Sequence, residues 1–233
     1  MAHAIERQCP AAKGRVHVLP YPVDLQVYRP PVAPRSYEGE LTVLYVGRVH
    51  PEKGLDLLVA AFRELLPRVP RACLRIVGPA ESEQGGGGAG YLDGLRSACA
   101  GMPVEFVGPL REPAQLAREY QGAHCFCYPS VAEEGEAFGL AVLEAMATES
   151  PTVVSRLECF SDFLGDGAEG VVFDHRGPAP VGALADALCS VLLEPRKAAA
   201  LGARARARAE RYSVARVAAA YIKLFERVAS QRG

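Results

Sequence analysis

One stretch of sequence decides the fold: Glu133-Glu134-Gly135-Glu136-Ala137-Phe138-Gly139-Leu140-Ala141-Val142-Leu143-Glu144-Ala145-Met146-Ala147. It begins with acidic residues and a glycine, and it then becomes an apolar segment rich in good helix formers. This change of composition predicts a loop that turns into a helix near residues 138–140.

The flanking segments have the composition of short buried strands. Residues 124–130 read as a strand that is stopped by Pro129, and residues 151–155 are a second β-rich run. A strand, a loop, a helix and a strand form one unit of a parallel α/β sheet. Because ligands bind beyond the carboxyl ends of the strands in such sheets, we expect a ligand at the loop before residue 138.

The acidic residues of this stretch occupy two different places. Glu136 precedes the expected helix, and Glu144 lies about one and a half turns beyond Gly139, at roughly 3.6 residues per turn. Between them, the backbone N–H groups of Phe138, Gly139 and Leu140 form a helix N-terminus, which is a natural anion site. Carboxylates can hold hydroxyl groups and backbone amides can hold a phosphate, so this combination suits a sugar nucleotide. A surface loop and a helix with solvated glutamates explain the same spacing.

This segment resembles the E-x7-E signature of retaining glycosyltransferases of family 4, whose two-domain fold is called GT-B. Glu136 and Glu144 are the two acids of the signature, and Pro129-Ser130 precedes them. The resemblance implies a Rossmann-like parallel sheet with helices on both faces, one half of a GT-B fold. The sequence departs from the pattern at Ala147-Thr148-Glu149-Ser150-Pro151, where family members usually carry a glycine before the proline.

A second loop carries positive charge. Residues 42–46 read as a buried strand, Gly47-Arg48-Val49-His50-Pro51-Glu52-Lys53-Gly54 follows, and a helix is expected over about 55–66. An arginine and a lysine between a strand and a helix suit a diphosphate, since arginine offers a planar fork of donors and lysine a mobile point charge. A solvated surface pair is the alternative.

The resemblance also implies a role for each site residue. Glu136 contacts sugar hydroxyls near the reacting carbon, and Arg48 and Lys53 stabilise the charge on the leaving diphosphate. These three are the expected catalytic residues. The expected donor-binding residues are Gly47, Phe138, Gly139, Leu140, Glu144 for the ribose hydroxyls, and Leu110 near the base. No metal and no other cofactor is expected.

A run of glycines offers a competing interpretation. Gly85-x-Gly87-x-x-Gly90 matches the dinucleotide fingerprint and favours an NAD-dependent oxidoreductase. However, the preceding strand is expected to end near Gly78, and a glycine run meets this pattern by composition alone. We therefore interpret residues 85–90 as a flexible surface loop before a helix over about 91–100.

Composition narrows the class of protein. The 233 residues are 49% hydrophobic and 23% charged with a net charge of −1, typical of a soluble globular chain and not of a nucleic-acid binder. No apolar run approaches the ~18 residues of a transmembrane helix. The seven cysteines lack C-x-x-C spacing, which predicts free thiols and a reducing, cytoplasmic location. The basic stretch 204–211 is interpreted as a solvated helix face.

The expected domain organisation follows the same resemblance, which covers about residues 15–230. Residues 1–40 are a lead-in and linker-like segment with a short strand within 15–25, and residues 41–233 form the nucleotide-sugar-binding domain. The expected function is retaining transfer from a nucleoside diphosphate sugar to an acceptor hydroxyl, together with a missing or separate N-terminal acceptor-binding domain. Peripheral membrane contact and self-association stay open. A non-catalytic nucleotide-binding or interaction module is the second alternative.

Overall fold

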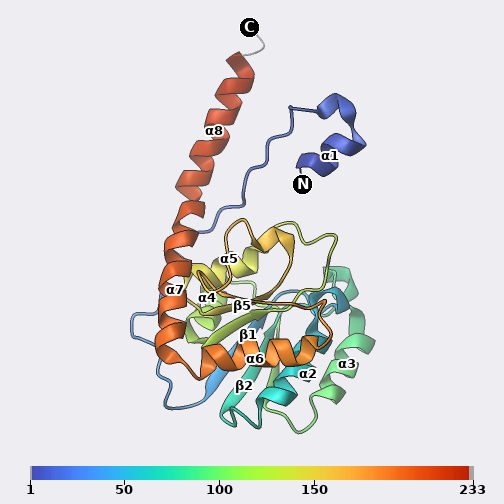
Figure 1. Ribbon diagram of the computed structural model, residues 1–233, viewed down its shortest axis with the longest axis vertical. Helices are drawn as coiled ribbons and strands as arrows, with labels where there is room; N and C mark the ends of the chain where they lie inside the picture. Colours follow the sequence, from blue (N-terminus) through green and yellow to red (C-terminus); the bar gives the residue numbers. More distant parts are fainter. Residues whose placement is uncertain (1, 231–233) are drawn as a thin grey trace.

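The computed structural model describes residues 2–230, and a parallel sheet forms its centre (Figure 1). Within this range the sheet has six strands in the order β3-β2-β1-β4-β5-β6. The strands are β1 (Leu41–Val46), β2 (Ala72–Val77), β3 (Val104–Gly108), β4 (Cys125–Tyr128), β5 (Thr152–Ser155) and β6 (Val171–Phe173). This confirms the α/β, Rossmann-like fold that the sequence predicts.

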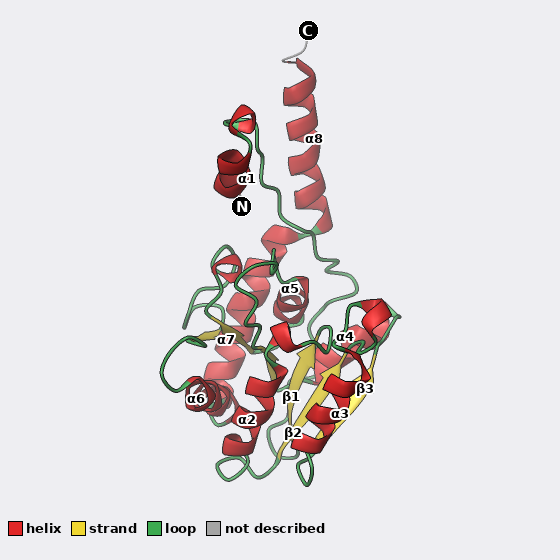
Figure 2. Cartoon of the chain, turned by 90° about the vertical axis from the view of Figure 1, so that its right-hand side faces the viewer, coloured by secondary structure: helices red, strands yellow, loops and turns green. Residues whose placement is uncertain are grey.

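Helices cover both faces of the sheet (Figures 1 and 2). On one face pack α2 (Leu55–Leu65), α3 (Gly88–Ala98) and α6 (Pro180–Leu192). On the other face pack α4 (Pro113–Gly122), α5 (Leu140–Ala147) and α7 (Pro195–Ala209). Figure 2 shows that α1 (Ala2–Gln8) and most of α8 (Val214–Ser230) extend away from the sheet.

Short 3-10 turns complete the chain. They are η1 (Pro10–Ala12), η2 (Pro51–Lys53), η3 (Ser82–Gln84), η4 (Glu158–Phe160) and η5 (Glu210–Tyr212).

The strands are apolar because both faces of the sheet are covered. Each residue of β4 and β5 is buried, and β1 is buried except at one position. The order of the strands reverses between β1 and β4, so the loops that follow these two strands share the switch point of the sheet. The fold therefore places the loop after Val46 beside the loop after Tyr128.

The strand predicted within residues 15–25 is wrong. In this segment Val23 makes an isolated bridge with Ser213, and its amide donates to the carbonyl of Tyr212 at 2.8 Å. Pro20 and Pro22 stand just before this position and have no N–H group to donate to a neighbouring strand. The segment is therefore extended chain that is tied to the start of α8.

The flexible surface loop predicted for residues 85–90 is also wrong. The amide of Gly87 donates to the carbonyl of Val49 and that of Gly88 to Ala80, both at 2.8 Å, and α3 begins at Gly88. A Cβ atom on Gly86 would lie 2.2 Å from the carbonyl oxygen of Ala80. The glycines thus permit close backbone packing, which their composition does not reveal.

The basic stretch 204–211 is only in part the solvated helix face that the sequence predicts, since Arg204 and Arg211 are exposed whereas Arg206 and Arg208 are partly buried. Arg206 donates to the carbonyls of Ala147 at 2.7 Å and Tyr28 at 3.0 Å, and Arg208 donates to the carbonyl of Asp162 at 2.6 Å. These carbonyls lie at helix ends and in loops, where the backbone lacks partners of its own. The arginines therefore hold separate segments of the chain together.

The last helix, α8, carries apolar side chains at helical spacing, but most of them are uncovered. Val217 is buried, whereas Tyr221 is 40% and Phe225 64% exposed. Among residues 2–230, no helix combines the length and the apolar character needed to cross a bilayer.

Replacement of Glu149 by glycine should stabilise the fold. Glu149 follows α5 with a φ of 55°, a left-handed conformation that costs a residue with a side chain about 1 kcal/mol or more. We expect Glu149→Gly to raise the free energy of unfolding by about 1 kcal/mol, measured by urea denaturation. Glu149→Ala keeps the strain and is the control. An equal gain from alanine would show that the side chain, and not the backbone, is responsible.

Candidate functional site

The loops after β1 and β4 are in direct contact at the switch point. Gly54 lies between η2 and α2 with a φ of 69°, and a Cβ atom there would lie 2.1 Å from the carbonyl oxygen of Pro129. The amide of Val131 donates to the carbonyl of Glu52 at 2.9 Å. Glycine at position 54 therefore allows the start of α2 to lie against the end of β4.

This contact brings together Lys53 and Glu136. Lys53 Nζ lies 2.7 Å from Glu136 Oε2, and the two side chains are only 7% and 10% exposed. The hydroxyls of Tyr128 and Ser130 donate to the same oxygen, at 3.2 and 3.1 Å. Within the described part of the chain, no hydrogen bond reaches the other carboxylate oxygen, Oε1. The cluster is thus a buried ion pair with one unused acceptor.

Arg48 is fixed next to this pair by a different set of contacts. Its Nη1 donates to the carbonyl of Gly85 at 2.7 Å, and its Nη2 pairs with the carboxylate of Glu52. Burial alone would raise the pKa of Glu52, but the positive charges of Lys53 and Arg48 hold that pKa below its ordinary value. Gly47 joins Arg48 to β1, and its amide donates to the carbonyl of Val77.

The start of α5 presents backbone amides. The helix begins at Leu140 as predicted, and Gly139 at the N-cap provides no side chain to cap it. The amides of Phe138, Gly139 and Leu140 donate to no group among residues 2–230. The ring of Phe138 packs on Phe163 with 5.1 Å between ring centroids. This helix end can therefore donate to an anion or to a hydroxyl group.

Glu144 belongs to a separate cluster on the side of α5. Tyr120 donates to its Oε2 at 2.9 Å, and Tyr28 also hydrogen-bonds to it. Burial raises the pKa of Glu144, and the hydrogen bonds from Tyr120 and Tyr28 oppose this effect. The structure thus places the two acids of the signature in different surroundings, one beside a cation and one beside phenols.

The remaining candidate, Leu110, lies apart from these clusters. It follows β3 at the edge of the sheet and packs against the core. No group of three or more His, Cys, Asp or Glu side chains suited to a metal ion occurs within residues 2–230.

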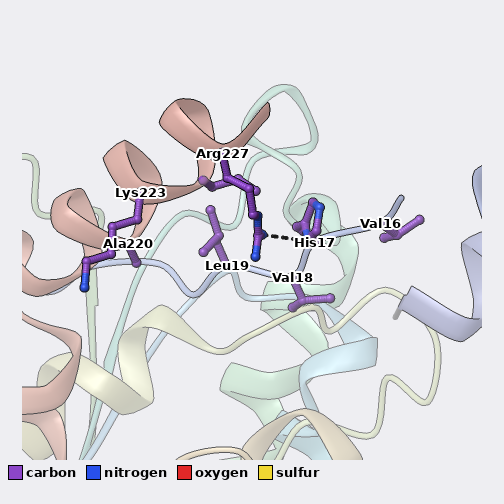
Figure 3. Close-up of a pocket in the computed structure, with 8 residues that line it drawn as sticks. Val16, His17, Val18, Leu19, Ala220, Lys223 and Arg227 are labelled. Atoms are coloured by element: carbon purple, nitrogen blue, oxygen red, sulfur yellow. Dashed lines mark hydrogen bonds between the residues drawn. The ribbon is translucent and has the colours of Figure 1, made fainter. Parts of the chain in front are cut away.

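A cavity of about 370 Å³ lies elsewhere, between residues 16–19 and α8 (Figure 3). It contains His17, whose Nδ1 lies 3.3 Å from Arg227 Nη2. None of the candidate residues lines it. The clustered charges at the switch point, and not this cavity, therefore mark the candidate site.

Residues 31–208 match the family model described as "Glycosyl transferases group 1". The chain belongs to this family. It is 32% identical over 209 residues to the D-inositol 3-phosphate glycosyltransferase of Segniliparus rotundus. The matched region covers 85% of this chain and 44% of that protein. The chain spans about half the length of the curated relatives it matches.

Solved structures agree with this family at the level of the fold. The sucrose-phosphate synthase of Thermosynechococcus elongatus is 26% identical with a TM-score of 0.82, covering 98% of this chain and 56% of that one. The Anabaena protein HepE, in complex with UDP and glucose, is 20% identical with a TM-score of 0.77, covering 98% and 61%. The resemblance to GT-B glycosyltransferases is therefore confirmed.

Several contacting residues do not follow from the motifs. Tyr128 and Ser130 hold Glu136, Glu52 and Gly85 hold Arg48, and Tyr120 holds Glu144. One signal was available in the sequence, because Glu52 stands four residues after Arg48 at a spacing typical of ion pairs. Tyr128 and Tyr120 lie in an apolar strand and an amphipathic helix, where a tyrosine reads as a core residue.

Removal of Lys53 should destabilise the chain through Glu136. Loss of one partner leaves a buried charge without compensation, so we expect Lys53→Met to cost about 3 kcal/mol in urea denaturation at pH 7. Lys53→Met/Glu136→Gln removes both charges and should recover most of this loss. A loss below about 1 kcal/mol for the single variant would mean that the pair behaves as a solvated one.

The variant Glu144→Gln should be more stable than the parent chain at neutral pH. Because burial raises the pKa of Glu144 above its ordinary value of 4.5, the folded state loses stability as the pH rises through that raised pKa. A neutral glutamine avoids this loss. We expect the gain at pH 7 to vanish below about pH 4.5, measured by urea denaturation across pH. Glu83→Gln at an exposed position is the control, and a gain that is independent of pH would contradict the assignment.

Proposed function

We propose that this chain is the donor-binding part of a glycosyltransferase that moves a sugar from a nucleoside diphosphate sugar to an acceptor hydroxyl, with retention of configuration. The observation that carries the proposal is the meeting, at the switch point of the sheet, of two cations, the Glu136 carboxylate and three amides that donate to no group within residues 2–230. HepE, which has the same fold, was solved with UDP and glucose.

The cations suit the diphosphate. Arg48 and Lys53 follow β1, and their charges favour an anion that develops as the sugar departs. In the proposed division of labour, these two side chains neutralise the leaving diphosphate without a metal ion. The open amides of residues 138–140 add donors for a phosphate or a sugar oxygen.

The carboxylates suit hydroxyl groups. Glu136 has a free oxygen, Oε1, that can accept from a sugar hydroxyl while Oε2 stays bound to Lys53, Tyr128 and Ser130. Glu144 is assigned to the ribose hydroxyls. Gly47 lets the chain pass close to the diphosphate, and Leu110 is assigned to the side of the base.

The acceptor site belongs, in this proposal, to a further domain. The exposed apolar face of α8 is the surface that such a domain would cover, and without it this face favours self-association. The proposed location is the cytoplasm, since the seven cysteines, all within the described residues, are free thiols.

Two other functions remain to be separated from this one. In the NAD-dependent oxidoreductase, the glycine run would bind the dinucleotide, whereas its Gly85 carbonyl accepts from Arg48 and its Gly87 amide donates to Val49. A non-catalytic nucleotide-binding module would use the same residues as the proposed donor site. Calorimetric titration with UDP-, GDP- and ADP-glucose and with NAD distinguishes the first, and transfer assays with the acceptor domain supplied distinguish the second.

Loss of Arg48 should weaken binding of the diphosphate selectively. We expect Arg48→Gln to lower the affinity for the best nucleoside diphosphate by tenfold or more, since a hydrogen bond to a charged group is worth about 1.5–3 kcal/mol. The affinity for the corresponding nucleoside should not change. Arg63→Gln, which removes another arginine that donates to a carbonyl, is the control. Equal losses for both ligands, measured by calorimetry, would refute the role of Arg48.

A further inference from the structure

We propose that Tyr128 and Ser130 are positioning residues of the donor site, which hold Glu136 so that its Oε1 faces the sugar. The inference rests on the proposed function and extends it to residues outside the two signature acids. It concerns how the site distinguishes a nucleoside diphosphate sugar from the bare nucleoside diphosphate.

The geometry of Glu136 is the first support. Lys53 Nζ, Tyr128 OH and Ser130 Oγ all approach Oε2, at 2.7, 3.2 and 3.1 Å, while Oε1 takes no hydrogen bond among residues 2–230. A carboxylate whose one oxygen is held from three directions has little rotational freedom left. Its second oxygen is therefore an oriented acceptor.

The hydroxyl groups themselves are also fixed. The Tyr128 ring is buried, stacks on Tyr45 with 5.9 Å between centroids and packs edge-on against Phe160. Burial and the charge of Glu136 raise the pKa of Tyr128, so its phenol keeps its proton and remains a donor. Ser130 is fully buried, and the carbonyl of Glu52 at 3.3 Å is an alternative acceptor for its single proton. Of the two hydroxyls, that of Tyr128 is therefore the more constant donor to Glu136 Oε2.

The charge balance explains why such donors are needed. A diphosphate competes with Glu136 for Lys53, since both are anions and lysine is a single mobile point charge. When Lys53 turns toward a phosphate, Glu136 keeps a buried charge that needs other partners. Tyr128 and Ser130 are uncharged and do not respond to the phosphate, so they keep Oε2 in place while Oε1 binds the sugar.

The test compares two ligands on the same variants of the 233-residue chain. Calorimetry measures the Kd of UDP and of UDP-glucose, with the GDP and ADP pairs in parallel. The variants are Tyr128→Phe and Ser130→Ala, each of which removes one hydroxyl group, together with Tyr128→Phe in a Glu136→Ala background, which has no acceptor at position 136. Tyr91→Phe is the matched control, because Tyr91 also donates its phenol proton to a carboxylate, that of Asp56 at 2.7 Å.

The expected result is a selective loss. Tyr128→Phe should weaken the sugar nucleotide about tenfold relative to the bare diphosphate, and Ser130→Ala should have a smaller effect in the same direction. Tyr91→Phe should leave the ratio of the two affinities unchanged, and Tyr128→Phe should add nothing in the Glu136→Ala background.

Other outcomes overturn the inference. Equal losses for diphosphate and sugar nucleotide, or an unchanged ratio, would mean that Tyr128 has a structural role only. The same selective loss in the Glu136→Ala background would mean that Tyr128 acts without Glu136. If the parent chain binds none of the nucleotides, the proposed function fails first and this inference fails with it, so the two failures are told apart by the parent chain alone.

Discussion

The parallel pairing of β1 with β4 is the constraint on which the site depends. Val43 pairs with Cys125 and Leu44 with Phe126, and the strand order reverses at this seam. The helices that follow the two strands therefore begin on opposite faces of the sheet, and their loops diverge from one point. Lys53 and Glu136, 83 residues apart in sequence, form a 2.7 Å ion pair only because these two strands are neighbours.

The charges at this point neutralise one another in pairs. Arg48 pairs with Glu52 and Lys53 with Glu136. A buried pair of this kind adds little to the stability of the fold, because desolvation offsets the attraction. A buried cation without its carboxylate would destabilise the fold strongly. A ligand with a diphosphate must then compete with two carboxylates for the cations. In this way the fold can hold positive charge at the carboxyl ends of its buried central strands without losing stability.

Much of the fold was predictable because its signals are local. The change from an acidic loop to helix formers at 138–140 places the start of α5 correctly, and the acids and cations of the site stand in short motifs. The predictions that were wrong all concern backbone groups paired across long distances. Whether the amide of Gly87 meets the carbonyl of Val49, or Arg206 meets the carbonyl of Tyr28, depends on which segments are neighbours in space. The hydrophobic periodicity of the sequence does not indicate which segments become neighbours.

Both signature acids depend on residues that are distant in sequence. Glu136 is held by Lys53 together with Tyr128 and Ser130, and Glu144 is held by Tyr120 and by Tyr28, which lies outside the sheet and before its first strand. Arg206 fixes the carbonyl of Tyr28 at 3.0 Å and that of Ala147, at the end of α5, at 2.7 Å.

Further along the same segment, Arg35 holds the exit of α5 by donating to the carbonyls of Thr148 at 3.0 Å and Glu149 at 2.9 Å. The residues before the sheet are therefore bound to the C-terminal half of α5 and its exit, from Glu144 to the strained turn at Glu149. A shift of this segment would move a phenol away from Glu144 and change the pKa of that carboxylate, while the Lys53–Glu136 pair would keep all its partners. The proposed donor site thus has one half set by the switch point and one half set by the chain that leads into the sheet.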